Sequence, residues 1–491
     1  MSAALVGLSC KAGRSIAGGF ADGSYVIGHR LRDREPFPTP ARTVRVPLVI
    51  VGGGVAGLAA AWRLDKRRFH DFVVLEMEQR AGGNARWGEN DVTAYPWAAH
   101  YVPVPGRRAA LVRELFEELG VLHGGQWEER YLCFDPQERL FLHGEWQEGI
   151  EPAIGLGARD RQEFRRFAMR MAEFRATGRF TIPMELGASP SPLDRLSMAE
   201  WLQREGFTSS ALRWYVDYAC RDDYGALATD ASAWAGVHYF ASREPEGRGP
   251  LTWPEGNGWI VQQLLARVGK YMRTNAFVSR IERSSTRWRV RSPQVEYVAD
   301  AVIFAAPTFL APYVLDAMPD PAFVYSPWLT ANLTLEHWPR ERGMPAAWDN
   351  VIYKSPALGY VVATHQSLRT TEERTVWTFY WALADGTPTA NRAFLLAHDW
   401  SFWKEAILAD LERAHPDIRG CVSRIDVMRW GHAMVRPAIG FLSVRERFQR
   451  LAHPERLYFA HSDLSGLSLF EEAQYRGVQA ADRALAALTG L

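Results

Sequence analysis

The sequence contains few cysteines and no long hydrophobic segment, and its charges nearly balance. Its cysteines are scattered without the C-x-x-C spacing of zinc sites or of a disulfide framework: Cys10, Cys133, Cys220 and Cys421. No run approaches the roughly 18 consecutive apolar residues of a membrane-spanning helix. The formal net charge of +1 gives no long-range field for nucleic acid or an anionic membrane. These absences argue against a metal site, a membrane span and a nucleic-acid partner.

The beginning of the chain shows no periodic pattern. Residues 11–43 are rich in Gly, Arg, Pro and Ser, so residues 1–43 are predicted to form an irregular leader. The run Met1–Cys10 ends like an apolar signal segment before a lipoprotein cysteine, but no basic region precedes it. We predict a cytoplasmic protein; export or lipid anchoring is the alternative if the true N-terminus carries a signal.

The stretch from Val44 to Glu76 predicts a strand, a tight turn, a helix and a second strand. The turn carries Gly52-x-Gly54-x-x-Gly57, and an alanine-rich helix follows it. Gly52 permits the sharp turn, Gly54 lets the backbone approach a pyrophosphate, and Gly57 lets the helix lie close to the sheet. The first helical residues, Val55 and Ala56, offer free N–H groups to phosphate. Glu76 ends the second strand, where an acid accepts hydrogen bonds from a ribose diol. The unit predicts dinucleotide binding.

The residues after Glu76 point to one dinucleotide. Arg80, Gly82 and Gly83 complete an E-x-x-x-R-x-G-G pattern that resembles the FAD-binding signature of the flavin-containing amine oxidase superfamily. This superfamily includes monoamine and polyamine oxidases and carotenoid desaturases, so the resemblance implies FAD. An arginine usually follows the glycine pair, and here Asn84 stands in its place.

The same resemblance extends to later segments. It implies that the backbone of Ala98 and Ala99 runs beneath the flavin ring, with His100 and Tyr101 facing the substrate. The alternative for this stretch is an ordinary edge strand with a buried histidine.

Two further segments follow in the superfamily's order. By resemblance, Val278 touches the adenine, and Asp463 hydrogen-bonds the ribityl chain. The N–H groups around Glu472 and Ala473 are expected to point at the flavin N1 and O2 edge. No cysteine lies near Asp463, so the FAD is expected to be held without a covalent bond.

The predicted fold class is α/β. A discontinuous Rossmann-like FAD-binding domain is combined with an α+β substrate domain that contains an antiparallel sheet. The predicted FAD-binding parts are residues 44–106, 255–310 and 425–491. The predicted substrate-domain parts are a helical region, 107–254, and a strand-rich region, 311–424.

The helix-forming run Leu212–Tyr224 holds an unusual set of charges among apolar residues. Asp222 and Asp223 could face a cavity and bind a cationic substrate. Alternatively, arginine and aspartate side chains in this run could close a structural ion pair.

Other catalytic candidates are less well supported. Amine oxidases of the superfamily commonly carry a lysine on the strand that follows the Ala-Pro, but the corresponding run here, WLTANLT, has none. Lys354, the only lysine between residues 311 and 403, lies on a later segment. Leu469 replaces the family's frequent tyrosine, so Phe470, Trp430 and His432 are the candidates for lining the pocket.

The sequence therefore predicts an enzyme, an FAD-dependent oxidoreductase. The first hypothesis is hydride transfer from an amine or amino-acid-like small molecule to flavin N5, with oxygen or another acceptor reoxidising the flavin. The second is a desaturase or isomerase of an apolar, isoprenoid-like substrate, which the missing lysine and Leu469 favour. The third is a flavin-binding protein without turnover. A homodimer is compatible with each.

Overall fold

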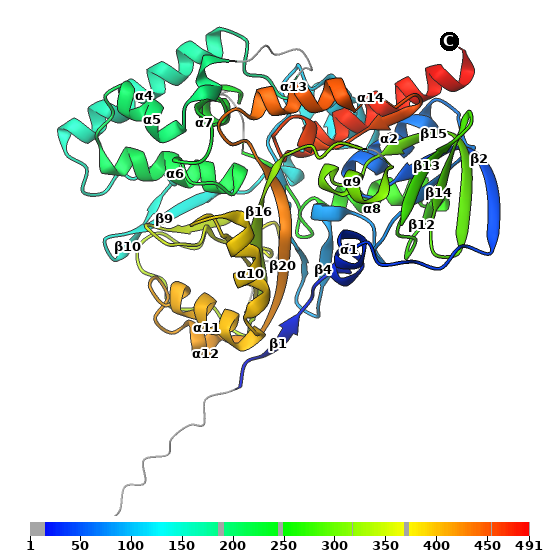
Figure 1. The fold of residues 1–491 in the computed structure, drawn as a ribbon. Helices are drawn as coiled ribbons and strands as arrows, with labels where there is room; N and C mark the ends of the chain where they lie inside the picture. Colours follow the sequence, from blue (N-terminus) through cyan, green and yellow to red (C-terminus); the bar gives the residue numbers. More distant parts are fainter. Residues whose placement is uncertain are drawn as a thin grey trace, which may run out of the picture.

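The computed structural model describes residues 15–184, 191–243, 249–316, 318–367, 373–452 and 454–490. Its strands form two large sheets with helices packed against them (Figure 1). Among these residues, no helix is both long and apolar enough to cross a membrane.

The first sheet is the predicted Rossmann-like unit. Its strands run β12-β3-β2-β15-β14-β13, with β21 paired to β15, and those from β12 to β15, together with β21, are parallel. Apolar runs make the central strands fully buried on both faces, as parallel sheets require. The strands are β2 (Arg42–Val51), β3 (Phe72–Leu75), β12 (Met272–Arg273), β13 (Arg280–Ser284), β14 (Arg287–Arg291), β15 (Val295–Phe304) and β21 (Leu457–Phe459).

Helices from three distant parts of the chain pack on this sheet. They are α2 (Val55–Lys66), α8 (Gly258–Val268) and α14 (Phe470–Thr489), and they share one apolar core with β2 and β15. A Cβ on Gly477 would lie 2.1 Å from the Ala56 carbonyl oxygen, so only glycine lets α14 cross α2 this closely.

The second sheet forms the substrate domain, and it is mostly antiparallel. Its strand order is β1-β20-β16-β19-β18-β17-β9-β10, with parallel pairing only between β1 and β20 and between β17 and β9. The strands are β1 (Ala17–Phe20), β9 (Glu138–Leu142), β10 (Glu145–Glu148), β16 (Val324–Leu335), β17 (Asp349–Ile352), β18 (Gly359–Val362), β19 (Thr375–Ala382) and β20 (Val422–Arg436).

Helices cover both faces of this sheet. Trp328 and Tyr380 pack toward α6, whereas their neighbours Leu329 and Phe379 pack toward α11, as the alternation of strand side chains requires. Figure 1 shows a group of helices on the α6 side and another on the α11 side. The first group is α4 (Ala158–Ala176), α5 (Met198–Arg204), α6 (Ser210–Tyr224) and α7 (Ala233–Ala241), and the second is α10 (Pro388–Ala397) and α11 (Trp400–Leu411).

Two parts of the predicted layout differ from the structure. Residues 15–43 were expected to be irregular, but they contain β1 and helix α1 (Tyr25–Arg32), which is anchored by the buried Leu31. The border expected between residues 424 and 425 falls inside β20. Both differences arise because contacts with distant parts of the chain decide these segments, strand pairing for β1 and β20 and burial of Leu31 for α1, and local composition does not report them.

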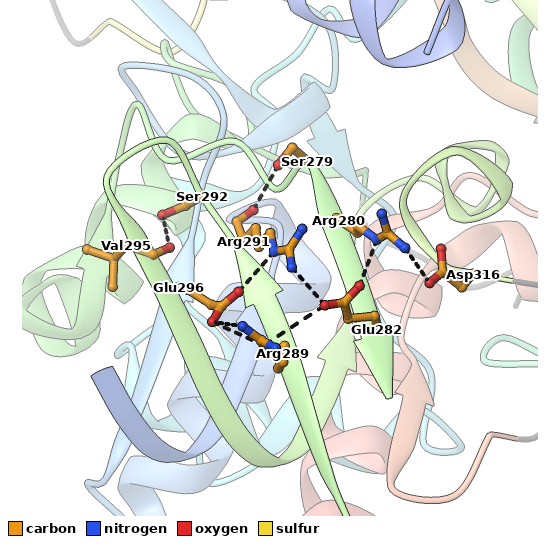
Figure 2. A network of polar contacts seen from close by, with 9 residues as sticks. All are labelled: Ser279, Arg280, Glu282, Arg289, Arg291, Ser292, Val295, Glu296 and Asp316. Carbon is orange, nitrogen blue, oxygen red and sulfur yellow. Dashed lines mark hydrogen bonds and ion pairs between the residues drawn. The ribbon is translucent and has the colours of Figure 1, made fainter. Parts of the chain in front are cut away.

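A ladder of charged side chains lies across β13, β14 and β15 (Figure 2). The Glu282 carboxylate contacts Arg280 at 2.8 Å and Arg291 at 2.9 Å, and Glu296 contacts Arg289 at 2.7 Å and Arg291 at 2.9 Å. Alternating charges along this surface keep the strands in register and soluble.

Replacing Glu282 with glutamine is expected to lower the free energy of unfolding by about 0.5 kcal/mol, because partly exposed ion pairs contribute little. Urea denaturation of both proteins would measure the change, which should shrink further at high salt. A loss above about 2 kcal/mol would contradict this account of the ladder.

Candidate active site

Two glycine motifs that are separate in the sequence meet at the end of β2. The Gly82 N–H donates to the Gly53 carbonyl at 2.9 Å, and Gly82 forms an isolated bridge with Gly54. A Cβ on Gly54 would meet nothing nearer than the Gly83 Cα, at 3.9 Å. The packing of the protein therefore leaves the Gly54 backbone open, as a phosphate-binding turn requires.

The other two glycines of the first motif, Gly52 and Gly57, are required by the backbone geometry of the turn. Gly52 has a φ of +104°, which side chains rarely adopt. A Cβ on Gly57 would lie 1.9 Å from the Gly52 carbonyl oxygen. These contacts place the start of α2, with Val55 and Ala56, directly at the turn, where its first N–H groups have no acceptor in the helix.

Glu76 is built into the same turn. Its carboxylate accepts the Gly53 N–H at 2.7 Å and the Glu78 N–H at 2.8 Å. Burial raises the pKa of Glu76, which is only 8% exposed. Since each carboxylate oxygen holds one protein hydrogen bond, each keeps capacity for a hydroxyl group of a ligand.

The segment that includes Val278 runs beside this acid. The Ala276 N–H donates to the Glu76 carbonyl at 2.8 Å, and the Asn275 N–H donates to that of Glu78 at 3.1 Å. Val278 itself is buried. The structure thus brings the first and second predicted cofactor segments together.

Asp463 connects the third segment to β15. Its Oδ2 accepts the Thr308 N–H at 2.9 Å and the Tyr325 hydroxyl at 2.7 Å, and its Oδ1 lies 3.0 Å from His461 Nδ1. Burial alone would raise the pKa of Asp463, but His461 and the hydrogen bonds hold it below its ordinary value. Much of its acceptor capacity is used within the protein, which leaves one position on Oδ1.

At the start of α14, the backbone N–H groups are the candidates for binding the cofactor, because the Glu472 side chain is buried in the protein. The buried Glu472 carboxylate accepts hydrogen bonds from Ser465 and from the Met184 N–H, and it lies 3.6 Å from Arg476. Glu472 can therefore reach a cofactor only through its N–H. The expected role of the Ala473 N–H was wrong, because this group already donates to the Leu469 carbonyl at 3.2 Å. The helix begins at Phe470, so the N–H groups of its first three residues, up to Glu472, lack intrahelical acceptors.

The substrate sheet holds the segment that contains Ala98 and Ala99. Thr330 on β16 donates to the Trp97 carbonyl at 2.7 Å, and the Tyr380 hydroxyl donates to that of Ala98 at 2.9 Å. The Ala99 N–H donates to the Asn84 carbonyl at 2.9 Å. Thr330, on the strand where the superfamily often has lysine, thus positions this backbone.

His100 and Tyr101 lie in an aromatic box. The His100 ring centroid is 5.0 Å from that of Tyr101, 5.4 Å from that of Trp348 and 4.6 Å from that of Tyr380. Burial lowers the pKa of His100 to about 4, so this imidazole is neutral at pH 7.

Two carboxylates next to this box face each other across adjacent strands. Asp349 on β17 and Glu138 on β9 are register partners, an arrangement that normally destabilises a sheet. Burial and mutual repulsion raise the pKa of Asp349, and burial raises that of Glu138. The Glu138 side chain nevertheless remains accessible to solvent.

Asp222 and Asp223 approach the same place from α6. Asp223 is bound by Arg243, whose Nη2 lies 3.1 Å from both carboxylate oxygens. Burial together with the Asp223 charge raises the pKa of Asp222 to about 7. Within the described ranges, no arginine or lysine pairs with Asp222, Asp349 or Glu138. The structural ion pair considered for this helix joins Arg221 to Asp217 instead, at 3.2 Å.

Several predicted site residues lie elsewhere. Lys354 is exposed on a turn with a φ of +56°, where it packs over Tyr353, so it is not part of this site. The Phe470 ring stacks on Phe116 in the core of the FAD-binding domain. Its ring is buried there against helix α3 (Ala110–Glu118), so its place in a pocket stays a prediction.

Two further candidates, Trp430 and His432, lie on β20. Trp430 donates to Thr330 at 3.1 Å, and His432 stacks on Phe309 with centroids 4.3 Å apart. Arg80 is exposed.

Sequence analysis missed Glu138, Asp349, Arg243, Trp348 and Tyr380. Their separate strands and helices give no spacing signal, and only the register of β17 with β9 shows that two acids are opposed.

The convergence of two glycine motifs, a buried acid and the starts of α2 and α14 defines a dinucleotide-binding oxidoreductase of the flavoprotein class. The chain belongs to the flavin-containing amine oxidoreductase family, whose model matches residues 55–485. Its cofactor is therefore FAD. No curated protein sequence matches the chain significantly.

Solved structures share the fold at low sequence identity. Putrescine oxidase bound to putrescine has a TM-score of 0.68 and 16% identity, covering 90% of this chain and 100% of its own. Cyclohexylamine oxidase from Brevibacterium oxydans has a TM-score of 0.66 and 16% identity, covering 91% and 99%. A fatty acid isomerase from P. acnes has a TM-score of 0.62 and 16% identity, covering 89% and 98%.

Proposed function

We propose that this enzyme oxidises a cationic amine. The observation that carries the proposal is the group of carboxylates Asp222, Asp349 and Glu138, which gather beside the aromatic box and have no ion pair with an arginine or lysine among the described residues. Unpaired buried charges are costly, and a bound ammonium group would relieve that cost. The substrate is then a small amine whose apolar part contacts His100 and Tyr101.

The cofactor contacts follow from the same geometry. We assign the Gly52–Gly57 turn to the pyrophosphate, Glu76 to the ribose, and the N–H groups that begin α14 to the flavin edge. FAD supplies the hydride acceptor, N5, when bound. Val278 and Asp463 complete the assignment at the adenine and the ribityl chain.

Asp222 is suited to a second role. An ammonium group must lose a proton before hydride can leave the adjacent carbon, because the nitrogen lone pair drives that step. A carboxylate whose pKa lies near 7 can accept this proton at the operating pH. Asp222 would thus bind the cation and then take its proton, while Asp349 and Glu138 keep the site attractive to cations.

The proposal is tested by anaerobic bleaching of the bound flavin with putrescine, cyclohexylamine and amino acids. We expect amines to bleach it and amino acids to do so less well, because three carboxylates repel a fourth. Peroxide formation in air would identify oxygen as the acceptor. Bleaching by an apolar isoprenoid, with no amine active, would contradict the proposal and support a desaturase or isomerase.

The activity should depend on pH through Asp222. Its charged form predominates above a pKa of about 7, so amine binding weakens as the pH falls through that value. Aliphatic amines stay protonated throughout this range, so the substrate charge does not change. Steady-state kinetics should show KM rising about tenfold from pH 8 to pH 6. A pH-independent KM would contradict this role.

A further inference from the structure

Residues 15–32 join the two domains, and they precede the part of the chain that the family model matches. Strand β1 pairs with β20 of the substrate sheet, and α1 buries Leu31 in the core of the FAD-binding domain. We call this segment, Ser15–Arg32, the N-terminal clasp. Between its two anchors it passes the loop that follows Glu76.

The clasp holds that loop through one carboxylate. The Ser24 N–H donates to Glu78 Oε1 at 2.8 Å, and the Ser24 hydroxyl donates to Glu78 Oε2 at 2.9 Å. A Cβ on Gly23 would lie 2.6 Å from Glu78 Oε1, so glycine at that position permits the approach.

The use of Ser24 is unusual for its position. Ser24 is the N-cap of α1, where a serine hydroxyl ordinarily accepts a backbone N–H of its own helix. Here it makes no such cap, and the hydroxyl serves Glu78 instead. Helix α1 therefore lacks the usual N-cap hydrogen bond, and the serine hydroxyl instead contacts the loop of the FAD-binding domain that follows Glu76.

The contact continues directly to the cofactor turn. The Glu78 N–H donates to Glu76 Oε1, and the Gly53 N–H donates to Glu76 Oε2. Ser24, Glu78, Glu76 and Gly53 therefore form one continuous chain of hydrogen bonds. It runs from the clasp to the acid assigned to the ribose.

A further contact ties the clasp to the substrate sheet. The Asp22 carboxylate accepts the Arg429 N–H at 3.0 Å and binds the Arg429 guanidinium, with both side chains about one-tenth exposed. A cavity of about 470 Å³ lies between the clasp and the FAD-binding domain, lined by Asp22, Glu78, Arg80 and Arg86 among others. The Ser24–Glu78 contact lies at the edge of this cavity, where it adds a polar link to the apolar anchor at Leu31.

We propose that Ser24 and Glu78 are positioning residues for the cofactor, and that the clasp slows FAD dissociation by fixing the orientation of Glu76. The inference rests on the proposed assignment of Glu76 to the ribose. Neither residue needs to touch the cofactor.

The test measures FAD release from the purified holoenzyme by flavin fluorescence after dilution. Glu78→Gln and Ser24→Ala are expected to release FAD about fivefold to tenfold faster, as loss of charge-assisted hydrogen bonds predicts. Ser24→Thr, which keeps the hydroxyl, should release FAD at close to the native rate. Glu282→Gln in the exposed ladder is the control for loss of an ion pair far from the site, and should not change the rate.

The melting temperature of each apoprotein separates this role from general stability. Faster release without a matching change in the melting temperature supports the proposal. Native release rates in Glu78→Gln and Ser24→Ala, with faster release in Glu76→Gln, would overturn the clasp inference alone. A native rate in Glu76→Gln as well would overturn the ribose assignment together with it.

Discussion

Replacing Asp222 with asparagine is expected to lower kcat/KM for a cationic amine by about 100-fold. A charged pair within a protein is worth several kcal/mol when one partner is removed, and 2.7 kcal/mol corresponds to a factor of about 100. The substitution also removes the proposed proton acceptor, so kcat should fall and the dependence of KM on pH should flatten. Initial rates over the amine panel, with and without the substitution, measure these effects.

The matched control is Asp217→Asn on the same helix. Asp217 accepts the Ala228 N–H at 2.8 Å and pairs with Arg221, so its loss should affect stability and leave amine kcat/KM nearly unchanged. Asp222→Asn should behave oppositely. Because folding raises the pKa of Asp222, its charged form disfavours folding above that pKa, and the amide should not destabilise the protein at pH 8. A change in amine kcat/KM below threefold would refute the role given to Asp222.

Replacing Gly57 with alanine is expected to cost about 3 kcal/mol of unfolding free energy and most of the FAD affinity. The added methyl group would lie 1.9 Å from the Gly52 carbonyl oxygen and 3.0 Å from its carbon, and both belong to backbone that cannot turn aside. Helix α2 must then move away from the turn, at the cost typical of overpacking, and its free N–H groups move with it. Urea denaturation and FAD titration of the apoprotein measure the two losses.

Gly28→Ala provides the comparison. Gly28 lies within helix α1, and a Cβ there would meet nothing within 4 Å. Alanine should be neutral or should stabilise the protein by about 0.5 kcal/mol. Equal losses from both substitutions would show that the contact at Gly52 is not the cause.

The cofactor region could be predicted because its signals are local. A strand, a glycine turn and a helix follow one another within Val44–Glu76. Each glycine stands where the backbone geometry of the structure leaves no room for a side chain or requires an open turn. The class of enzyme and the use of FAD followed from that stretch and from its resemblance to the family.

The substrate side could be predicted only in part. Asp222 was identified because carboxylates are unusual within an apolar helix. Asp349 and Glu138, which lie near it, come from strands more than 200 residues apart. Neither strand has a sequence pattern that predicts that the two strands pair. Lys354 was chosen by elimination and Phe470 by resemblance, and neither approach reports the direction of a side chain: Lys354 is exposed on a turn, and Phe470 stacks on Phe116.

The position of β1 has a consequence for how copies of this protein meet. Without that strand, β20 would form the border of the large sheet, and the backbone groups of Arg424 to Val427 that now pair with β1 would be unpaired. Such a border recruits strands from neighbouring molecules, which leads to aggregation. The edge of the sheet is instead the four-residue strand β1, which is shorter than β20 and offers fewer backbone groups to a foreign strand.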